Sequence, residues 1–471
     1  MLDRLGVAKS GKPGEHVTGT RILIAGAVAL IGALAVWGIY DALHSAGYIL
    51  YPTDLGVYRD GGLIVRHISP PYDGKPLYDW TNNGNLALKF TYTPFAALFF
   101  AAVSFVPWAI LTHLSQVVNL VSLVAAGWCT MIALGYTDRR VRAGGALLGA
   151  AAGLLTEPVF RTFYLGQINL FLMALIIWDL RQPDTPARRR WMGLATGFAA
   201  GVKLVPLVFI PYLLLTRRFR AAANAFAGFV GTVLLGFLIL PGDSKDFWLH
   251  GLFIQDGRTG FVGWTGNQSM RAIATRFAGS INDGTVLWVI AFVLVTVLGL
   301  LIAAMLYRAG HTMLGLLTAA LVGLLDSPIS WDHHWVWVVP GMMVAVHYAV
   351  RAWRAGNQRR AFGCGAIAAG MFLVFAAWPG DLWSVRTSGP GNFTFGLIWA
   401  GPYTPVKTYI AIGDKPWFLE YHWAGLQVLS GNAYVLAGLV LLAILGFTAL
   451  MTPARSRAEQ PAELGAAEAN A

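Results

Sequence analysis

Long apolar stretches alternate with short polar segments along the whole chain. The apolar stretches centre near Ala33, Phe100, Leu123, Ala151, Met173, Pro206, Val233, Val293, Leu317, Met342, Met371 and Leu441. Because about 20 consecutive apolar residues allow a helix to cross a bilayer, this pattern predicts an all-α, polytopic membrane protein with roughly eleven to thirteen membrane segments.

The polar segments are of two kinds. Short basic runs, which are typical of cytoplasmic loops, lie at residues 4–12, 139–142, 181–190, 217–220, 308, 351–360 and 455–457. The other polar segments are mostly longer, rich in aromatic residues and poor in Lys and Arg runs; they lie at residues 42–91, 156–167, 242–284, 326–334 and 379–431. We therefore predict that this second group faces the other side of the membrane.

Two stretches break the alternation. Residues 92–134 must cross the membrane an odd number of times but are long enough for two spans, so one element is predicted to be re-entrant or interfacial. Residues 191–216 have arginines near both ends, and we expect a broken helix or a hairpin with Lys203 at its tip. Non-helical backbone at membrane depth is tolerated where it lines a cavity.

Composition agrees with a membrane protein. Of the 471 residues, 56% are hydrophobic and only 12% are charged, whereas soluble proteins carry about 25% charged residues. The net charge of +11 comes with the basic loops, so it indicates membrane topology and not nucleic-acid binding. The two cysteines, Cys129 and Cys364, lie inside apolar stretches without metal-ligand spacing and are predicted to be packing residues.

The same pattern suggests three regions. Residues 1–20 are predicted to be a cytoplasmic tail, residues 21–452 a single transmembrane domain, and residues 453–471, rich in Ala and Glu, a disordered cytoplasmic tail. No convincing cleavage signature follows the first apolar stretch, so we expect a retained first helix.

Asp54 is the first candidate for chemistry, because charge near lipid is costly and usually functional. It lies just beyond the first span in the segment Tyr-Pro-Thr-Asp-Leu-Gly-Val-Tyr-Arg-Asp-Gly-Gly. The chain turns at Pro52, so the carboxylate is expected at the membrane face. Asp54 could cap a short helix or act as a catalyst, and one carboxylate can do both.

A second cluster lies at a span boundary, in Asp-Ser-Pro-Ile-Ser-Trp-Asp-His-His-Trp at residues 326–335. The adjacent His333 and His334 point apart on a helix, which disfavours a shared metal ion. Interfacial aromatic belts account for Trp331 but leave the paired histidines unexplained.

Polar groups also open or interrupt the apolar stretches. Gln167 and Asn169 are hydrogen-bonding groups that suit either sugar hydroxyls or helix–helix contacts. Lys203 lies too deep for easy snorkelling, so its expected partner is an anion such as a lipid phosphate.

The outer segment Gly-Asn-Gln-Ser-Met-Arg at residues 266–271 is a weaker candidate, for which a solvated loop is the simpler interpretation. The chain has no phosphate-binding loop, dinucleotide fingerprint, nucleophile elbow or zincin motif. An activated donor must therefore be bound in another way, which favours a lipid-carried donor.

These motifs, in this order, resemble a known family. They are Asp-Leu-x-Val-Tyr at Asp54, Gly-Gln-Ile-Asn at Gly166, Lys-x-x-Pro at Lys203, Asn-Gln-Ser at Asn267 and Ser-Pro-Ile-Ser-Trp-Asp-His-His at Ser327. Together they resemble the polyprenol-phosphate-mannose-dependent mannosyltransferases of the GT-C superfamily, glycosyltransferase family 87, over residues 21–450. Within the family the chain is most similar to the actinobacterial enzymes that extend phosphatidylinositol mannosides.

The resemblance implies a GT-C fold in the inner (plasma) membrane with an extracytoplasmic active-site cavity. The donor would be polyprenyl-phosphate-mannose, the acceptor a phosphatidylinositol mannoside, and the transfer an inverting one that gives an α-linked product. Neither a metal nor another cofactor is expected.

The resemblance also assigns roles to residues. Asp54 matches the catalytic base, and His333 and His334 match the histidine-bearing region. The predicted substrate-binding residues are Tyr58, Arg59, Gln167, Asn169, Lys203, Asn267, Gln268, Arg271 and Trp331.

Other functions compete with this one. Family relatives also use lipid-linked arabinose. A sugar transporter or flippase would also bury Lys203 in a broken helix, although the spans show no two-half repeat. A lipid-linked oligosaccharide ligase or polymerase would bring a larger polar loop with paired arginines, and a membrane scaffold would leave Asp54 and His333 without a role.

Overall fold

The computed structural model describes residues 13–43, 52–81, 88–181, 190–255, 258–378, 396–399, 423 and 425–452. Within these ranges the chain forms helices and no named strand; three isolated β-bridges occur. The predicted all-α fold is therefore confirmed. The predicted tail at residues 453–471 lies outside the described residues, as does most of the tail at residues 1–20.

Nine helices among these residues are longer than 14 residues. They are α1 (Pro13–Leu43), α4 (Trp108–Ala133), α5 (Arg139–Leu154), α11 (Phe219–Ile239), α14 (Ile281–Arg308), α15 (Thr312–Asp326), α16 (Val338–Arg354), α17 (Gln358–Phe375) and α19 (Ala433–Met451).

Shorter α-helices connect or interrupt them. These are α2 (Thr53–Val65), α3 (Pro94–Val103), α6 (Glu157–Leu165), α7 (Asn169–Leu180), α9 (Leu194–Val202), α10 (Phe209–Leu215), α12 (Pro241–Ser244), α13 (Met270–Ala278) and α18 (Leu426–Gly431). Four 3-10 segments, η2 (Val205–Val208), η4 (Leu252–Ile254), η5 (Asp332–Trp337) and η7 (Leu397–Trp399), and the π-helical η3 (Lys245–Leu249) complete the set.

The protein is a multi-pass membrane protein. Six helices in the described ranges are long and apolar enough to cross a bilayer: Val17–Tyr40, Trp108–Ala133, Phe219–Ile239, Ile281–Arg308, Asp332–Arg354 and Ala433–Met451. The pair α6–α7, bent by 117°, would be a seventh. The remaining apolar stretches counted from the sequence form shorter or interrupted helices such as α3, η2–α10 and α15.

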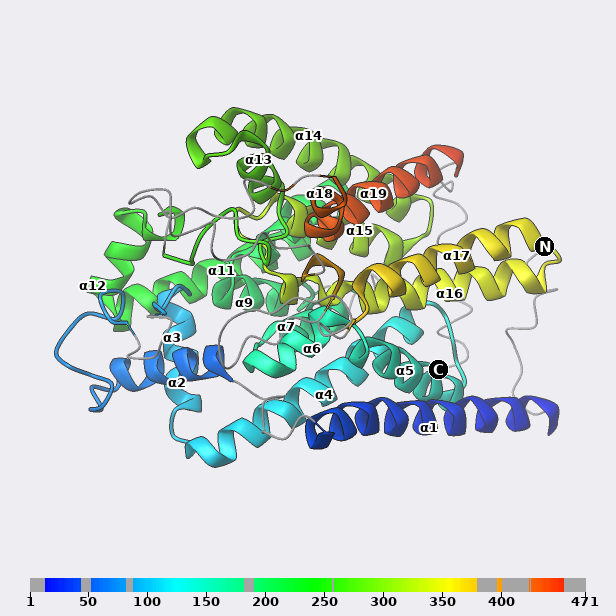
Figure 1. Cartoon of the computed structure of the whole chain (residues 1–471), viewed down its shortest axis with the longest axis horizontal. Coiled ribbons are helices and arrows are strands. Elements are labelled where there is room, and N and C mark those ends of the chain that lie inside the picture. Colours follow the sequence, from blue (N-terminus) through cyan, green and yellow to red (C-terminus); the bar gives the residue numbers. More distant parts are fainter. Residues whose placement is uncertain are drawn as a thin grey trace.

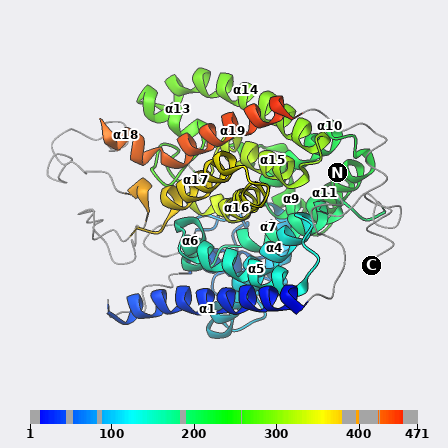
Figure 2. The same cartoon turned by 90° about the vertical axis from the view of Figure 1, so that its right-hand side faces the viewer.

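The long helices lie side by side, with α1 along one edge of the molecule and α14 along the opposite edge in both views (Figures 1 and 2). Close approach of α1 to α5 depends on small residues. A β-carbon at Gly26 would collide with the backbone of Gly144, and one at Gly144 would collide with Ile22. Such small-residue contacts let membrane helices pack backbone to backbone.

Both breaks in the predicted alternation are explained by short elements. Residues 92–134 contain one full-length helix, α4, and the ten-residue α3, which is too short to span. Residues 191–216 form a hairpin: α9 runs to Lys203, and η2–α10 returns. The returning end is fixed by Arg218, which hydrogen-bonds to Leu180 and Met192, so both ends of the hairpin lie together.

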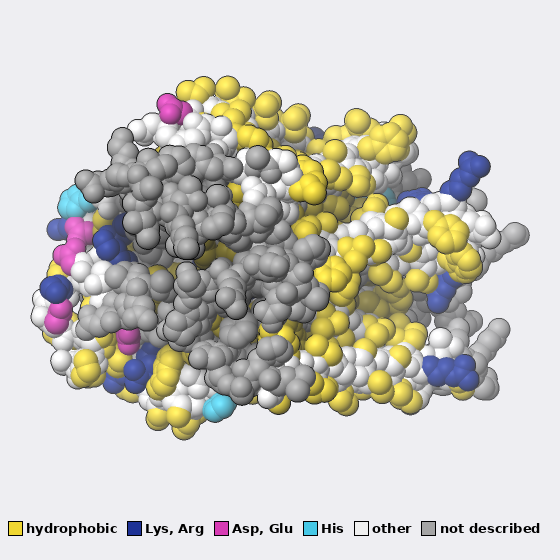
Figure 3. Space-filling model, viewed as in Figure 1, with side chains coloured by type: hydrophobic (Ala, Val, Ile, Leu, Met, Phe, Trp, Pro, Cys, Tyr) yellow, Lys and Arg dark blue, Asp and Glu magenta, His cyan; other side chains and the backbone are white. Residues whose placement is uncertain are grey.

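The surface is divided along the long axis. On the face seen in Figure 3, hydrophobic side chains cover the described helices in the middle and right of the view. Lys and Arg side chains stand at the right-hand tips, whereas the left of the view carries both acidic and basic side chains. A wide apolar zone between polar ends is what a bilayer-spanning protein requires.

Candidate active site

Interruptions of four helical segments meet at one place. α2 begins after Pro52, α6 and α7 are separated by residues 166–168, α9 ends before Lys203, and η5 follows the non-helical residues 327–331. Gly166 shows why these breaks can converge. Its φ of +67° is a left-handed conformation, and a β-carbon there would collide with Leu55 at the start of α2.

Asp54 lies in the first turn of α2 and is half-buried. Its Oδ2 accepts a hydrogen bond from Nε2 of Gln167, at the α6–α7 break. Residue Pro52 occupies the N-cap position, and no side chain caps the helix. Asp54 therefore makes a tertiary contact and does not have the capping role that the sequence left open.

Two tyrosines hold Gln167 in place. The hydroxyl groups of Tyr58 and Tyr92 donate to Oε1 of Gln167 over 2.7 and 3.3 Å, and the two hydroxyl oxygens are 2.6 Å apart. Burial raises the pKa of both phenols above the ordinary value, so they remain neutral donors. With its oxygen turned toward the tyrosines, Gln167 presents its nitrogen to Asp54.

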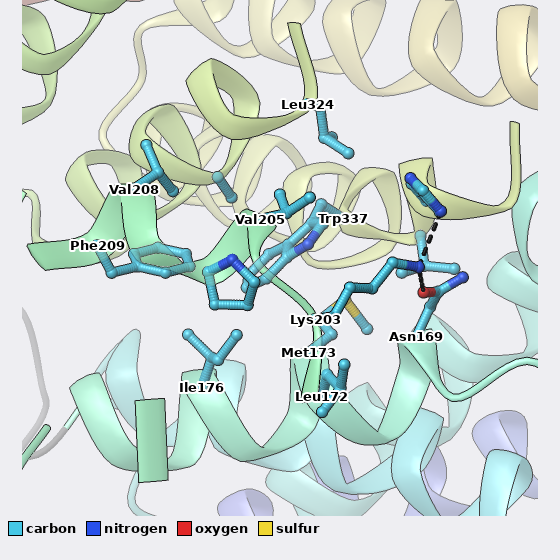
Figure 4. Close-up of a pocket in the computed structure, with 14 residues that line it drawn as sticks. Asn169, Leu172, Met173, Ile176, Lys203, Val205, Val208, Phe209, Leu324 and Trp337 are labelled. Carbon is cyan, nitrogen blue, oxygen red and sulfur yellow. Dashed lines mark hydrogen bonds between the residues drawn. The ribbon is translucent and has the colours of Figure 1, made fainter. Parts of the chain in front are cut away.

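Lys203 lies over the ring of Tyr92, with its ammonium nitrogen 5.6 Å from the ring centre. Its Nζ donates to Oδ1 of Asn169 and to Nε2 of His334, each over 2.8 Å (Figure 4). An ammonium group has three donors, and no ion pair involves Lys203 in the described part of the chain. The geometry therefore leaves room for an anionic ligand.

The negative charge of Asp54 reaches this group, because it acts electrostatically on both Lys203 and His333. Asn169 ties the two histidines to the lysine: its Nδ2 donates to the carbonyl oxygen of His333 over 2.9 Å. A carboxylate, an ammonium group and two imidazoles thus share one site.

His333 is oriented by a buried chain of charges. Its Nδ1 lies 3.0 Å from Oδ1 of Asp332, whose other oxygen lies 3.4 Å from Nε of Arg161. Glu157 lies 3.8 Å from the same Arg161 atom and accepts a hydrogen bond from Tyr434. The Asp332 contact favours a proton on Nδ1 of His333 and leaves Nε2 as the reactive nitrogen.

That second nitrogen is without a partner in the described part of the chain. Nε2 of His333 is buried and makes no hydrogen bond to any described residue. Since buried polar atoms are normally satisfied, this nitrogen, on a ring that interacts electrostatically with Lys203 and Asp54, suits contact with a ligand. His334, by contrast, already uses its Nε2 to accept a bond from Lys203.

A narrow slot lies beside Lys203, and Asp54 does not line it. Its volume is about 50 Å³; Lys203, Asn169 and His334 line its polar part, and apolar side chains of α7, η2, α10, α15 and η5 line the rest (Figure 4). Among these are Met173, Phe209 and Trp337. The polar groups around Lys203 therefore adjoin an apolar part of the slot.

The Asn-Gln-Ser segment is packed against the residues that precede η5. Asn267 and Gln268 are fully buried. Oδ1 of Asn267 accepts from the backbone N–H of Ser330 over 2.9 Å, while Nε2 of Gln268 donates to the carbonyl oxygens of Thr265 and Gly431. The Asn267 amide thus fixes the segment that leads into η5, whereas the Gln268 amide ties its own loop to the end of α18. Direct contact of either residue with substrate stays a prediction.

Three predicted binding residues remain: Arg59, Arg271 and Trp331. Arg59 is half-buried on α2, one turn beyond Asp54. The guanidinium group of Arg271, on α13, lies 4.8 Å from the centre of the Trp288 ring on α14. Trp331 packs edge-on against Trp264, with ring centres 5.4 Å apart. Their contact with substrate also stays a prediction.

Sequence reasoning missed several members of the site. Tyr92 was overlooked because an aromatic residue beside a span is usually an interfacial residue. Glu157 and Arg161 carried a usable signal, since opposite charges four residues apart on a helix are neighbours and can pair. Asp332 was noticed only as part of the histidine motif. No group of three or more His, Cys, Asp or Glu side chains suited to a metal ion occurs among the described residues.

Comparison with known proteins gives one family. The family model for Glycosyltransferase family 87 matches residues 90–328. A polyprenol-phosphate-mannose-dependent alpha-(1-2)-phosphatidylinositol mannoside mannosyltransferase of Mycobacterium tuberculosis is 33% identical over 68% of this chain and 75% of its own length.

Two further relatives are polyprenol-phosphate-mannose-dependent alpha-(1-2)-phosphatidylinositol pentamannoside mannosyltransferases. The one from Mycobacterium tuberculosis is 33% identical over 84% of this chain and 86% of its own length. The one from Mycolicibacterium smegmatis is 32% identical over 72% and 80%, respectively. No solved structure is significantly similar to the chain.

Proposed function

The chain belongs to glycosyltransferase family 87, and on that premise we propose that it transfers mannose from polyprenyl-phosphate-mannose to a phosphatidylinositol mannoside. The relatives named above act with this donor and on this class of acceptor. One observation supports the proposal for this chain: contacts through Gln167 and Tyr92 connect Asp54 to Lys203.

In this proposal Asp54 is the general base. A sugar hydroxyl is a weak nucleophile, and a carboxylate within hydrogen-bond reach takes its proton as the hydroxyl oxygen bonds to the anomeric carbon. The bond from that carbon to the phosphate oxygen breaks, and the oxygen leaves with the electron pair. Because attack and departure occur on opposite faces, a β-linked donor gives an α-linked product.

Lys203 receives the phosphate of the donor. The leaving phosphate gains negative charge, which a preorganised cation stabilises. Nε2 of His333, which has no partner among the described residues, would accept a hydrogen bond from a sugar hydroxyl. The slot beyond Lys203 would take the first carbons of the lipid chain, since its remaining walls are apolar.

We further propose that the site faces the extracytoplasmic side of the plasma membrane. The basic loops would then lie in the cytoplasm, as the distribution of Lys and Arg predicts. The hairpin supports this orientation, because it returns Arg217 and Arg218 to the end of the molecule that holds Arg181.

The test is a transfer assay with purified full-length protein, polyprenyl-phosphate-mannose and a mannosylated phosphatidylinositol, read as one added hexose by mass spectrometry. Asp54→Asn keeps the shape of the side chain but removes the base, so the rate should fall by about 10²- to 10⁴-fold. Asp60→Asn, on the same helix, is the matched control and should retain most activity.

Full activity in Asp54→Asn would show that Asp54 is not the general base. Movement of the donor across the membrane without hexose transfer would instead favour a flippase. A product with one added pentose, obtained only with a lipid-linked arabinose donor, would favour an arabinosyltransferase.

We expect the reaction to need no metal ion. A monophosphate donor carries less charge than a nucleotide diphosphate, and Lys203 offers the cation that its departure requires. Activity should therefore be unchanged by EDTA. Strong inhibition that added Mg²⁺ or Mn²⁺ reverses would contradict this expectation.

A further inference from the structure

A second, larger cavity lies apart from the candidate active site, between α15, α16, α17 and α19. Its volume is about 390 Å³, within the usual range for ligand pockets. Its walls are mainly leucine and other apolar side chains, and neither Asp54 nor Lys203 lines it. The sugar-transfer proposal gives this cavity no role.

Polar lining residues gather at one end of the cavity. Arg360 lies in the first turn of α17, and His311 immediately precedes α15. Nδ1 of His311 is 2.7 Å from the hydroxyl oxygen of Tyr348, near the end of α16. This is the basic end of the molecule, where α14 ends at Arg308 and α16 ends at Arg354.

The opposite end is closed by aromatic side chains. Trp335 packs against Phe375 with ring centres 5.7 Å apart, and Phe375 packs against Tyr434 at 4.2 Å. All three rings are at most 2% exposed. Leu324 and Trp337 line both this cavity and the slot at Lys203, so they stand between the two. A ligand's polar group therefore belongs at the Arg360 end.

The length of the cavity suits a lipid chain. From Arg360 to Phe375 the rise along α17 is about 22 Å, somewhat more than the ~15 Å that half of a bilayer core provides. An extended acyl chain can thus lie along α17 without leaving the apolar walls.

We propose that this cavity binds an acyl chain of an anionic phospholipid whose phosphate lies at Arg360. The guanidinium group matches phosphate geometry, and basic residues at a membrane surface attract anionic lipids. The lipid belongs to the leaflet at the basic end, opposite the leaflet in which the active-site end lies. It is therefore distinct from the donor and acceptor of the transfer reaction.

A native cysteine can serve as a chemical probe of this cavity. Cys364 lines the cavity and is half-buried, whereas Cys129, the other cysteine, is buried in α4. In a Cys129→Ser background, the rate at which N-ethylmaleimide modifies Cys364 reports whether the cavity is filled. The protein in detergent is titrated with phosphatidylglycerol or with phosphatidylcholine of the same chain length.

Phosphatidylglycerol should protect Cys364 at about fivefold lower concentration than phosphatidylcholine, as expected for one basic contact. Arg360→Gln should remove this difference. Arg359→Gln is the matched control, because its side chain does not line the cavity, and it should keep the difference.

A second pair of variants tests the cavity itself. A β-carbon at Gly363 or at Gly365 would meet no atom within 4 Å, but only Gly363 lines the cavity. Both Gly363→Leu and Gly365→Leu raise helix propensity and should fold. After detergent exchange, Gly363→Leu should retain less phosphatidylglycerol than the parent, and Gly365→Leu should retain as much.

Equal protection by the two lipids, or equal loss in Arg359→Gln and Arg360→Gln, would overturn the headgroup assignment. Undiminished lipid retention in Gly363→Leu would overturn the cavity assignment. Protection by a polyprenyl phosphate but not by phosphatidylglycerol would assign the cavity to the donor chain and also overturn the proposal. None of these outcomes depends on whether the protein transfers mannose.

Discussion

At the scale of single residues, the site depends on how neutral groups orient charged ones. Gln167 donates to Asp54 while two tyrosine hydroxyls fix its oxygen. Asn169 similarly accepts from Lys203 and donates to the backbone of His333. The uncharged residues singled out as possible sugar ligands thus have a second use, which is to set the positions of the base and the cation.

Gln167→Leu should lower the transfer rate by about 10²-fold, since a small displacement of a reacting group has effects of that size. The variant loses the donor to Asp54 and leaves the tyrosine hydroxyls without their acceptor. Gln116→Leu is a suitable control because Gln116 bonds to the backbone of Phe163 in α6 and not to Asp54. Equal rates for both variants would show that Asp54 needs no such support.

The buried charged residues that orient His333 allow two variants with effects of different size to be compared. Asp332→Asn leaves Arg161 buried without its closer carboxylate, which should cost about 3–5 kcal/mol of stability, and it also lowers kcat through His333. Tyr434→Phe removes only a hydrogen bond to Glu157, so about 1–2 kcal/mol should be lost with kcat nearly unchanged. Thermal unfolding and steady-state kinetics check both. A kcat unchanged in Asp332→Asn would show that His333 needs no orienting carboxylate.

At the scale of elements, function depends on where helices stop. Pro52, Gly166 and Lys203 each lie at an interruption, and the interruptions face one another. An uninterrupted helix bonds all of its backbone internally and keeps its side chains on a continuous cylinder. Broken ends free backbone and side chains to converge, which is tolerated at membrane depth when they surround a cavity.

Gly166→Ala tests this dependence. The left-handed backbone costs a residue with a β-carbon roughly 1–2 kcal/mol, and that carbon would also displace the start of α2 at Leu55. Both stability and transfer should fall. Gly74→Ala has the same backbone cost at φ +87° but meets no neighbour, so it should lower stability slightly and leave transfer intact. Retained transfer in Gly166→Ala would show that catalysis does not depend on the close contact between α2 and the α6–α7 break.

At the scale of the whole molecule, the proposed orientation fixes which loops are accessible from outside the cell. Asp73 lies in the polar segment after α2, and Gln358 begins α17 at the basic end. Both positions are exposed. In a background with both native cysteines replaced by serine, Asp73→Cys should react with a membrane-impermeant maleimide in intact cells and Gln358→Cys should not. The reverse pattern would invert the proposed topology.

Much of the fold followed from local pattern alone. Apolar stretches and basic runs indicated a polytopic helical protein, and arginines at both ends of residues 191–216 indicated the hairpin tip at Lys203. The number of full-length helices did not follow, because apolarity does not reveal where a helix bends. The 117° turn between α6 and α7 lies where the polar segment at residues 156–167 meets the next apolar stretch, and Gly166 is the residue whose left-handed backbone permits it.

The sequence by itself determined the membrane character, the family resemblance and the identity of Asp54, Lys203 and His333 as candidates, because each of these depends on residue type and short-range order. Only the tertiary structure decided the partners: Gln167 and not a helix end for Asp54, His334 for Lys203, and Asp332 for His333. It also distinguished the fully buried Asn267 from the residues beside the slot. The first two pairings join residues 113 and 131 positions apart, and such contacts arise from packing, which no local pattern encodes. Asp332 is the sequence neighbour of His333, and there the structure decided only that its carboxylate meets the ring.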